Sequence, residues 1–208
     1  MLLAIDVGNT NIVLGVFEGD RLSQSWRLLT VRERTADELG VFVIQLHERS
    51  GIDRQHLTGI ILASVVPPLT RTVEEMCVQY FGRQPVTVDA GSNTGMPVLY
   101  QPPSDVGADR VVNGVAAFEQ FGRATSIPII CVDFGTATTF DAISKRGEYL
   151  GGVICPGIGI SADALFQRAA RLPRVDVRKP ATVIGNTTVT SMQSGLFWGY
   201  VDMVEGLL

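Results

Sequence analysis

Residues 3–22 read LAIDVGNTNIVLGVFEGDRL, and residues 130–150, ICVDFGTATTFDAISKRGEYL, follow the same plan. In each stretch an apolar strand ends at an aspartate, a tip of glycine and short polar residues follows, and a second strand leads into a Gly-containing turn. Asp6 aligns with Asp133, and Gly8 aligns with Gly135. One such tip alone is equally well explained as a plain hairpin turn. A chance turn need not recur with the same aspartate, glycine and flanking strands, so the repeat predicts two related halves.

Periodicity and turn signals predict the remaining elements. The first half is expected to hold strands at 2–5, 12–17 and 21–28, a helix at 35–49 that starts with a capping box of Thr35 and Glu38 in TADE, a strand at 57–66, a helix at 70–81, a short strand at 85–88 and a helix at 106–121. The second half is expected to place strands at 127–133 and 148–155 on either side of its hairpin, before a Gly/Pro-rich loop and a helix. Alternating strands and helices predict an α/β fold with halves at 1–121 and 122–208.

The composition restricts the class of protein. With 46% hydrophobic and 18% charged residues, the chain of 208 residues can bury a substantial core. A net charge of −4 without a basic cluster argues against a nucleic-acid groove, which needs concentrated Lys and Arg. The longest uncharged stretches contain Pro or several Gly and are too short to span a bilayer. We therefore expect neither a nucleic-acid partner nor a membrane partner.

Cysteine and histidine usage narrows the chemistry. The N-terminus has no cationic region before its apolar run, so a secretory signal is not expected. Three cysteines without a CxxC spacing predict reduced thiols in a cytoplasmic protein. The two histidines, His47 and His56, lie in polar stretches and are predicted to be exposed, which argues against a His-dependent triad.

Two facing hairpins of this kind suit a nucleoside triphosphate. Glycines let backbone N–H groups approach phosphate oxygens, while Thr and Asn side chains donate hydrogen bonds. Each aspartate can hold a hydrated cation, because Mg²⁺ takes oxygen ligands and keeps several waters. The first tip is not a Walker A loop, since no GK[ST] follows its glycine.

With DVGNTN and DFGTATT in place, the chain resembles the acetate and sugar kinase/Hsp70/actin superfamily, and within it the type III pantothenate kinases. The matching stretches run from residue 4 to about 195: IDVGNTNIVLGVF, SWRLLTVRERTADELG, ASVVPP, GADRVVNGVAA, VDFGTATTFD, GGVICPGIGIS and SMQSG. The resemblance implies two ribonuclease H-like halves of an actin-like ATPase fold, with the active site in the cleft between them. It also implies ATP-dependent phosphorylation of pantothenate to 4'-phosphopantothenate, the first step of coenzyme A biosynthesis.

The segment GADR, residues 107–110, carries the substrate chemistry implied by the resemblance. Asp109 is its candidate proton acceptor, although a first-turn acid favoured by the helix dipole is the plain alternative. Arg110 is expected either to clamp the pantothenate carboxylate or to pair with Asp109 or Asp105. The implied substrate-binding residues are Tyr100, Gly107, Ala108, Asp109, Arg110 and Thr188.

Thr188 carries an open question of register. A helix N-cap is an equally good use for this residue. Family members commonly have a lysine where Asn186 stands, and the doubled Thr187-Thr188 leaves the substrate contact uncertain by one position.

The resemblance also implies the nucleotide and cation sites. Asp6 is expected to serve Mg-ATP, and Asp133 is expected to bind a monovalent cation, K⁺ or NH₄⁺. Spacing alone does not distinguish K⁺ from Mg²⁺ at Asp133. The implied ATP-binding residues are Asp6, Val7, Gly8, Asn9, Thr10, Asn11, Ile12, Val13 and Thr136.

The chain end and the assembly complete the expectations. Helical spacing from Met192 continues to Leu208 without a C-cap signal, so the second half is expected to be truncated. A homodimer is expected from the resemblance and the apolar composition, with Trp198 and Tyr200 as candidate interface anchors. Two alternatives stay open: another small-molecule kinase of this fold, and a nucleotide-binding regulatory protein like the accessory factors described in transcription.

Overall fold

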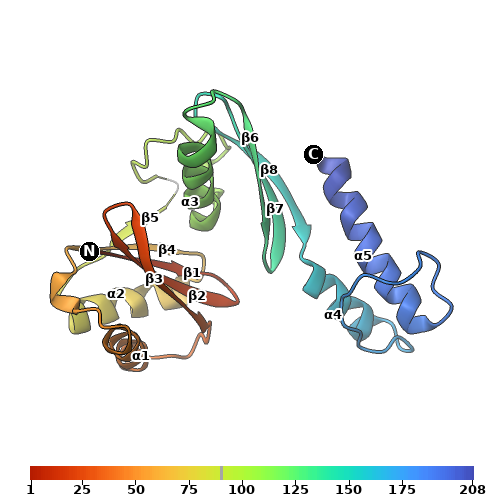
Figure 1. Cartoon of the computed structure of the whole chain (residues 1–208), viewed down its shortest axis with the longest axis horizontal. Coiled ribbons are helices and arrows are strands. Elements are labelled where there is room, and N and C mark those ends of the chain that lie inside the picture. Colours follow the sequence, from red (N-terminus) through yellow and green to blue (C-terminus); the bar gives the residue numbers. More distant parts are fainter. Residues whose placement is uncertain (90) are drawn as a thin grey trace.

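The computed structural model describes residues 1–89 and 91–208. Its first sheet has five strands. The strands are β1 (Leu2–Val7), β2 (Asn11–Glu18), β3 (Arg21–Leu29), β4 (Gly59–Ser64) and β5 (Val86–Val88), in the order β3-β2-β1-β4-β5 (Figure 1). β1 pairs antiparallel with β2 and parallel with β4, so the sheet is mixed.

Two helices cover one face of the first sheet. α1 (Ala36–Arg49) begins with the predicted capping box of Thr35 and Glu38, and α2 (Pro67–Phe81) packs beside it. Their apolar side chains meet alternate residues of β1 and β2, such as Leu3 and Ile5, in the larger core. Because side chains alternate along a strand, Asp6 lies on the opposite face of the sheet, away from this core.

The second sheet has three antiparallel strands, β6 (Ile129–Phe134), β7 (Ala137–Ile143) and β8 (Tyr149–Pro156), in the order β6-β7-β8 (Figure 1). It repeats the arrangement of β1, β2 and β3, which confirms the predicted α/β fold with two related halves. α3 (Ala108–Ala117) contacts β6 and β7 and also β4 of the first sheet. Val111 of α3 joins Ile143 and Tyr149 in a smaller second core.

Several element boundaries differ from the prediction for local reasons. Pro67 was predicted to follow the end of a strand; it instead occupies the first turn of α2, where a proline loses no helical hydrogen bond. The helix predicted at 106–121 divides into α3 and a π-helical turn at Phe118–Gly122. Short 3₁₀ turns at Arg54–His56 and Pro103–Asp105 were not predicted.

The C-terminal part adds α4 (Ile158–Arg168) and α5 (Thr188–Leu207), which pack on each other beyond the end of β8 (Figure 1). Within the described residues, we find no helix whose length and hydropathy would let it cross a bilayer. The proposed division after residue 121 stays a prediction, and α3 contacts both sheets.

The prediction of an exposed His47 was wrong. This side chain is 1% exposed and lies between the rings of Trp26 and Phe81. It follows Leu39 and Val43 at steps of four residues, so it belongs to the buried face of α1. Its Nδ1 lies 2.7 Å from the Val43 carbonyl oxygen, and burial lowers the pKa of the imidazole.

Candidate active site

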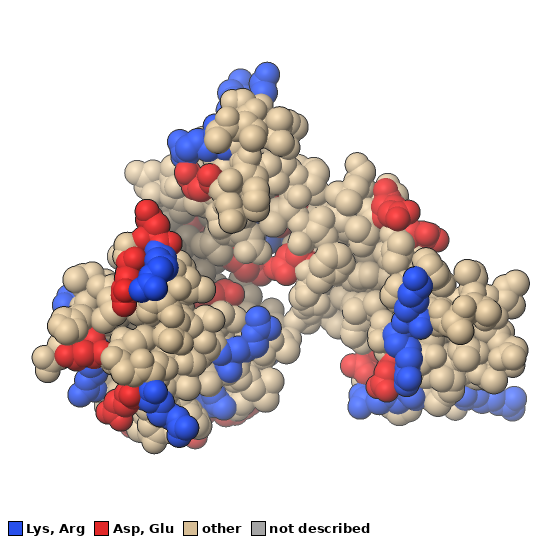
Figure 2. All heavy atoms as spheres, viewed as in Figure 1, with Lys and Arg blue, Asp and Glu red and all other residues tan. Residues whose placement is uncertain are grey.

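The two hairpins meet tip to tip across a cleft. The hydroxyl oxygens of Thr10 and Thr136 lie 2.7 Å apart, within hydrogen-bond distance. The cleft has a volume of about 360 Å³, and acidic side chains gather in the hollow at the centre of the molecule (Figure 2). Its lining comprises Asp6, Gly8, Asn9, Thr10, Asn11, Val13, Arg27, Val65, Asp109, Asp133, Phe134, Gly135, Thr136, Ala137 and Thr139.

The first tip is closed by a backbone hydrogen bond of its own and by the side chain of Thr30. The Gly8 N–H donates to the Asn11 carbonyl at 2.9 Å, and the Thr30 hydroxyl donates to the Gly8 carbonyl at 2.7 Å. These bonds leave Asn9 and Thr10 exposed at the tip, where they can meet a ligand. Val7 and Ile12, both among the predicted ATP-binding residues, instead direct their side chains into the larger core. These two residues can offer a nucleotide only backbone groups.

The second tip is held from behind by the start of α4. The Gly135 N–H donates to the Ala137 carbonyl at 3.0 Å, and the Gly157 N–H donates to the Thr136 carbonyl at 3.1 Å. A Cβ atom on Gly157 would lie 2.3 Å from the Thr136 carbonyl oxygen and 2.6 Å from that of Gly135. Only glycine allows this approach, so Gly157 sets the position of the second tip.

Three carboxylates face the cleft from three elements. Asp6 lies on β1, Asp109 in the first turn of α3 and Asp133 on β6. Burial, and then the charges of Asp109 and Asp133, raise the pKa of the Asp6 carboxyl. Its Oδ1 is buried without a hydrogen-bond partner among the described residues, as expected for an oxygen that awaits a cation or a donor. The Asn113 Nδ2 donates to Asp133 Oδ2 at 3.1 Å and so links α3 to β6.

Asp109 is held in a defined orientation. The Arg110 N–H donates to its Oδ1 at 2.8 Å, and a Cβ atom on Gly107 would lie 2.5 Å from the same oxygen. Burial raises the pKa of the Asp109 carboxyl; the Arg110 N–H opposes that rise, and the charge of Asp133 adds to it. A carboxylate with a raised pKa in a cleft has the properties of a proton acceptor.

Arg110 pairs with a residue that the sequence prediction did not consider. Its Nε donates to Asp141 Oδ1 at 2.7 Å, so the predicted alternatives of a side-chain pair with Asp109 or Asp105 were wrong. Tyr100 lies near Arg110. Its ring packs on the second core and would lie 3.4 Å from a Cβ atom on Gly151, next to the Gly152 that faces Arg110. Of the GADR segment, Asp109 lines the cleft, while Arg110 and Tyr100 lie against the neighbouring glycines Gly152 and Gly151 of β8.

Thr188 is placed elsewhere. Thr187, not Thr188, is the N-cap of α5, and its hydroxyl accepts from the Thr190 N–H at 3.1 Å. Thr188 does not line the cleft, and α5 begins at the opposite end of the molecule from the first sheet (Figure 1). Within one chain, the structure does not bring Thr188 to Asp109 or Arg110.

Arg27 is a cleft residue that the sequence prediction missed. It lies opposite Val13 in the β2–β3 pairing and provides a positive charge in a cleft lined by three carboxylates. It forms no ion pair within residues 1–89 and 91–208. The signal was available, since Arg27 lies in the SWRLLT stretch that resembles the family.

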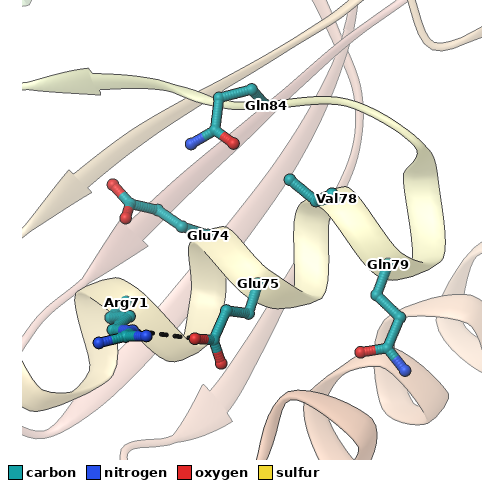
Figure 3. Close-up of a pocket in the computed structure, with 6 residues that line it drawn as sticks. All are labelled: Arg71, Glu74, Glu75, Val78, Gln79 and Gln84. Atoms are coloured by element: carbon teal, nitrogen blue, oxygen red, sulfur yellow. Dashed lines mark hydrogen bonds and ion pairs between the residues drawn. The ribbon is translucent and has the colours of Figure 1, made fainter.

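A second hollow beside α2 lacks comparable chemistry. It has a volume of about 460 Å³ and is lined by five polar side chains and Val78, with Arg71 donating to Glu75 at 2.9 Å (Figure 3). Glu74 likewise accepts from the Thr87 hydroxyl at 2.8 Å. These charged groups already have partners, and neither hairpin reaches this hollow. Its lining residues are Arg71, Glu74, Glu75, Val78, Gln79 and Gln84.

Comparison with known proteins decides the family. The family model described as type III pantothenate kinase matches residues 2–208. The chain belongs to the type III pantothenate kinase family. The type III pantothenate kinases of Anaeromyxobacter dehalogenans and Moorella thermoacetica are 56% and 54% identical to it, each alignment covering 100% of this chain and 80% of the relative. This kinase therefore uses ATP to phosphorylate pantothenate, the first step of coenzyme A biosynthesis.

Solved structures agree on the fold. A protein of Campylobacter jejuni assigned to the Baf family of transcriptional activators gives a TM-score of 0.58 at 19% identity, covering 99% of this chain and 79% of that one. A protein of Sinorhizobium meliloti assigned as a 2-dehydro-3-deoxygalactonokinase gives 0.53 at 12% identity, covering 100% and 81%. Identities this low show the fold alone. The regulatory and other-kinase alternatives give way to pantothenate kinase, because the family match over residues 2–208 names that activity.

Proposed function

We propose that the two hairpin tips hold the phosphates of ATP and that Asp109 accepts the proton of the pantothenate hydroxyl. The observation that carries this proposal is the convergence of both tips and three carboxylates on one cleft. Backbone N–H groups and the side chains of Asn9, Thr10 and Thr136 are the phosphate donors. Arg27 adds a positive charge where negative charge gathers on the transferred phosphoryl group.

The transfer itself is a displacement at phosphorus. The hydroxyl oxygen of pantothenate forms a bond to the γ-phosphorus, while the bond from that phosphorus to the β–γ bridging oxygen breaks and ADP leaves. The hydroxyl proton passes to the carboxylate of Asp109. The raised pKa of Asp109 supports this role, because it brings the group closer to the working pH.

The carboxylate end of pantothenate is assigned to the GADR segment. Arg110 binds the carboxylate, and Tyr100, Gly107, Ala108 and Thr188 complete the pocket. The placement of Tyr100 beside the Arg110 segment supports this assignment. Thr188 lies apart from Arg110 in one chain, which supports a pocket completed by a second copy of the chain in a homodimer.

The homodimer has support from the surface of the second sheet. Ile130 is 49% exposed and Val153 is 41% exposed on the same face of this sheet, an apolar surface of the kind that homodimers bury. Tyr200 is less suited to the anchor role than expected, because its hydroxyl donates to the Pro156 carbonyl at 3.1 Å within the chain. We further propose that the enzyme acts in the cytoplasm without nucleic-acid or membrane partners.

Cations are assigned to two of the three carboxylates. Kinase chemistry requires ATP with a divalent metal, and the residues present fit it: Asp6 offers a buried, unpartnered oxygen. Mg²⁺ is commonly held by one or two carboxylates together with substrate phosphates and water, which suits a single Asp6. The ion would neutralise phosphate charge. Among the described residues, no three acidic, histidine or cysteine side chains converge closely enough to hold a metal ion by themselves. Asp133 is assigned to the monovalent cation, K⁺ or NH₄⁺.

A steady-state assay tests these assignments. Wild-type enzyme is measured with ATP, Mg²⁺ and a panel of hydroxyl substrates that includes pantothenate, in K⁺, NH₄⁺ and Na⁺ salts. We expect turnover with pantothenate, a higher Mg²⁺ requirement in Asp6→Ala and loss of K⁺ activation in Asp133→Ala. If the Asp133 variant and wild type respond identically when Na⁺ replaces K⁺, the monovalent assignment is wrong. Sedimentation velocity tests the homodimer, and a monomer with full activity would refute it.

A further inference from the structure

Arg110 occupies a niche formed by neighbouring positions of β7 and β8. Asp141 of β7 lies opposite Gly152 of β8. Tyr149, the first residue of β8, lies opposite Ile143 of β7. Asp141 is 0% exposed and Arg110 is 8% exposed, so this ion pair is buried. A buried carboxylate without a partner is costly, so the two charges depend on each other.

Contacts converge on one oxygen of Asp141. Oδ1 accepts from Arg110 Nε at 2.7 Å and from the Tyr149 hydroxyl at 2.7 Å. The Arg110 Nη2 lies 2.6 Å from the same oxygen but is not aligned as a hydrogen bond, and it has no other acceptor among the described residues. The guanidinium is therefore anchored along one edge; Nη2 is buried against Gly152, and Nη1, which makes no hydrogen bond among the described residues, keeps its N–H donors for a ligand.

Gly152 makes the niche possible. A Cβ atom at this position would lie 2.7 Å from Arg110 Nη2 and 1.9 Å from the Phe140 carbonyl oxygen. The guanidinium therefore rests against bare backbone on one side and Asp141 on another. The first turn of α3 is an unfavourable place for a cation, because the helix dipole is positive there. Asp141 offsets that repulsion and fixes the side chain.

We infer that Asp141 is a positioning residue for substrate recognition: it orients the Arg110 guanidinium for the carboxylate of pantothenate. This inference rests on the proposed substrate role of Arg110. A free arginine samples many rotamers, and an arginine ordered in advance spends less conformational entropy on binding. The Tyr149 hydroxyl donates to Asp141 Oδ1, so Tyr149 helps to hold Asp141 and acts on Arg110 only through it.

The test is a double-mutant cycle on the full chain with Asp141→Asn, Arg110→Gln and the double variant. Asparagine keeps the size of the side chain and one acceptor oxygen while it removes the charge. We expect Asp141→Asn to raise KM for pantothenate about 10- to 100-fold, as misplacement of a binding group does. KM for ATP should stay within about twofold, because Asp141 lies outside both hairpin tips and does not line the cleft. In the Arg110→Gln background, Asp141→Asn should add nothing further to KM for pantothenate.

The outcomes separate the inference from the function on which it rests. If Arg110→Gln leaves KM for pantothenate unchanged, the proposed role of Arg110 fails. If Arg110→Gln raises it but Asp141→Asn does not, or if the two effects multiply independently, Asp141 is not a positioning residue. Equal increases in both KM values would indicate a general structural role and would also overturn the inference.

Two further variants serve as a control and as a substitute for Asp141→Asn. The control is Glu148→Gln, which removes the ion pair between Arg146 and Glu148, 2.9 Å long, at the turn between β7 and β8. It should leave both KM values unchanged. If Asp141→Asn does not fold, Tyr149→Phe decides, because it keeps the ion pair and removes one hydrogen bond to Oδ1. We expect a few-fold increase in KM for pantothenate alone, and no change would overturn the inference.

Discussion

Replacing Asp109 with asparagine removes a proton acceptor while it preserves the local structure. In the wild type, the Arg110 N–H donates to Asp109 Oδ1 at 2.8 Å, and asparagine keeps an Oδ1 that accepts this bond. It also adds no heavy atom where Oδ1 lies close to Gly107. The geometry of the cleft should therefore survive, and only proton acceptance should be lost. We expect kcat to fall by about 10² to 10⁴. Since each factor of ten in rate is about 1.4 kcal/mol, the barrier rises by about 3 to 5 kcal/mol.

Stability should change in the opposite direction from activity. The folded state raises the pKa of Asp109 above its ordinary value, chiefly through burial. Such a group stabilises the fold below its unfolded pKa, and that contribution is lost as the pH rises through the folded value. At neutral pH the ionised carboxylate therefore opposes folding, and Asp109→Asn should have a Tm equal to or above that of wild type. The same raised pKa predicts that kcat/KM of the wild type falls when acid protonates Asp109.

A coupled ATPase assay with pantothenate measures the rate, isothermal calorimetry measures ATP affinity, and thermal unfolding at pH 7 measures stability. Asp105→Asn is the control, because Asp105 is an exposed acid that precedes GADR and should leave the rate unchanged. Near-normal kcat in Asp109→Asn would remove Asp109 from the mechanism. A large loss of Tm or of ATP affinity would show that the variant disturbs the cleft, contrary to the reasoning above.

Three further outcomes follow from particular contacts. Gly157→Ala should lower Tm and weaken ATP binding measured by calorimetry, because its Cβ would lie 2.3 Å from the Thr136 carbonyl oxygen and overpacking costs about 1–3 kcal/mol; unchanged affinity would contradict this. Asn113→Leu removes the donor that lies 3.1 Å from Asp133 Oδ2 and should raise the K⁺ concentration for half-activation. Val115→Ala, which perturbs only the packing of α3, is the control, and an equal effect of this variant would exclude a specific role of Asn113. His47→Leu should flatten the fall of Tm between pH 7 and pH 5, since burial lowers the pKa of His47 and stability is lost as acid charges the imidazole; parallel Tm curves for variant and wild type would refute it.

Much of the fold could be predicted because its signals are local. Apolar strands that end in an aspartate and a Gly-containing tip recur in both halves, and the structure pairs them alike. The capping box at Thr35 was predicted correctly for the same reason, since its partners lie three residues apart. His47 was mispredicted because its polar neighbours in sequence point outward, while its spacing from Leu39 and Val43 places it inward.

The sequence by itself determined the two hairpins, the residue types at their tips and the family, because these depend on short-range spacing and on long matched stretches. Only the tertiary structure decided which side chains meet. Asp141 and Gly152 reach Arg110 through the β7–β8 register and the placement of α3, while Thr188 stays apart from the cleft within one chain. Contacts between distant residues depend on how whole elements pack, and a one-residue change of strand register would turn Asp141 to the other face of its sheet.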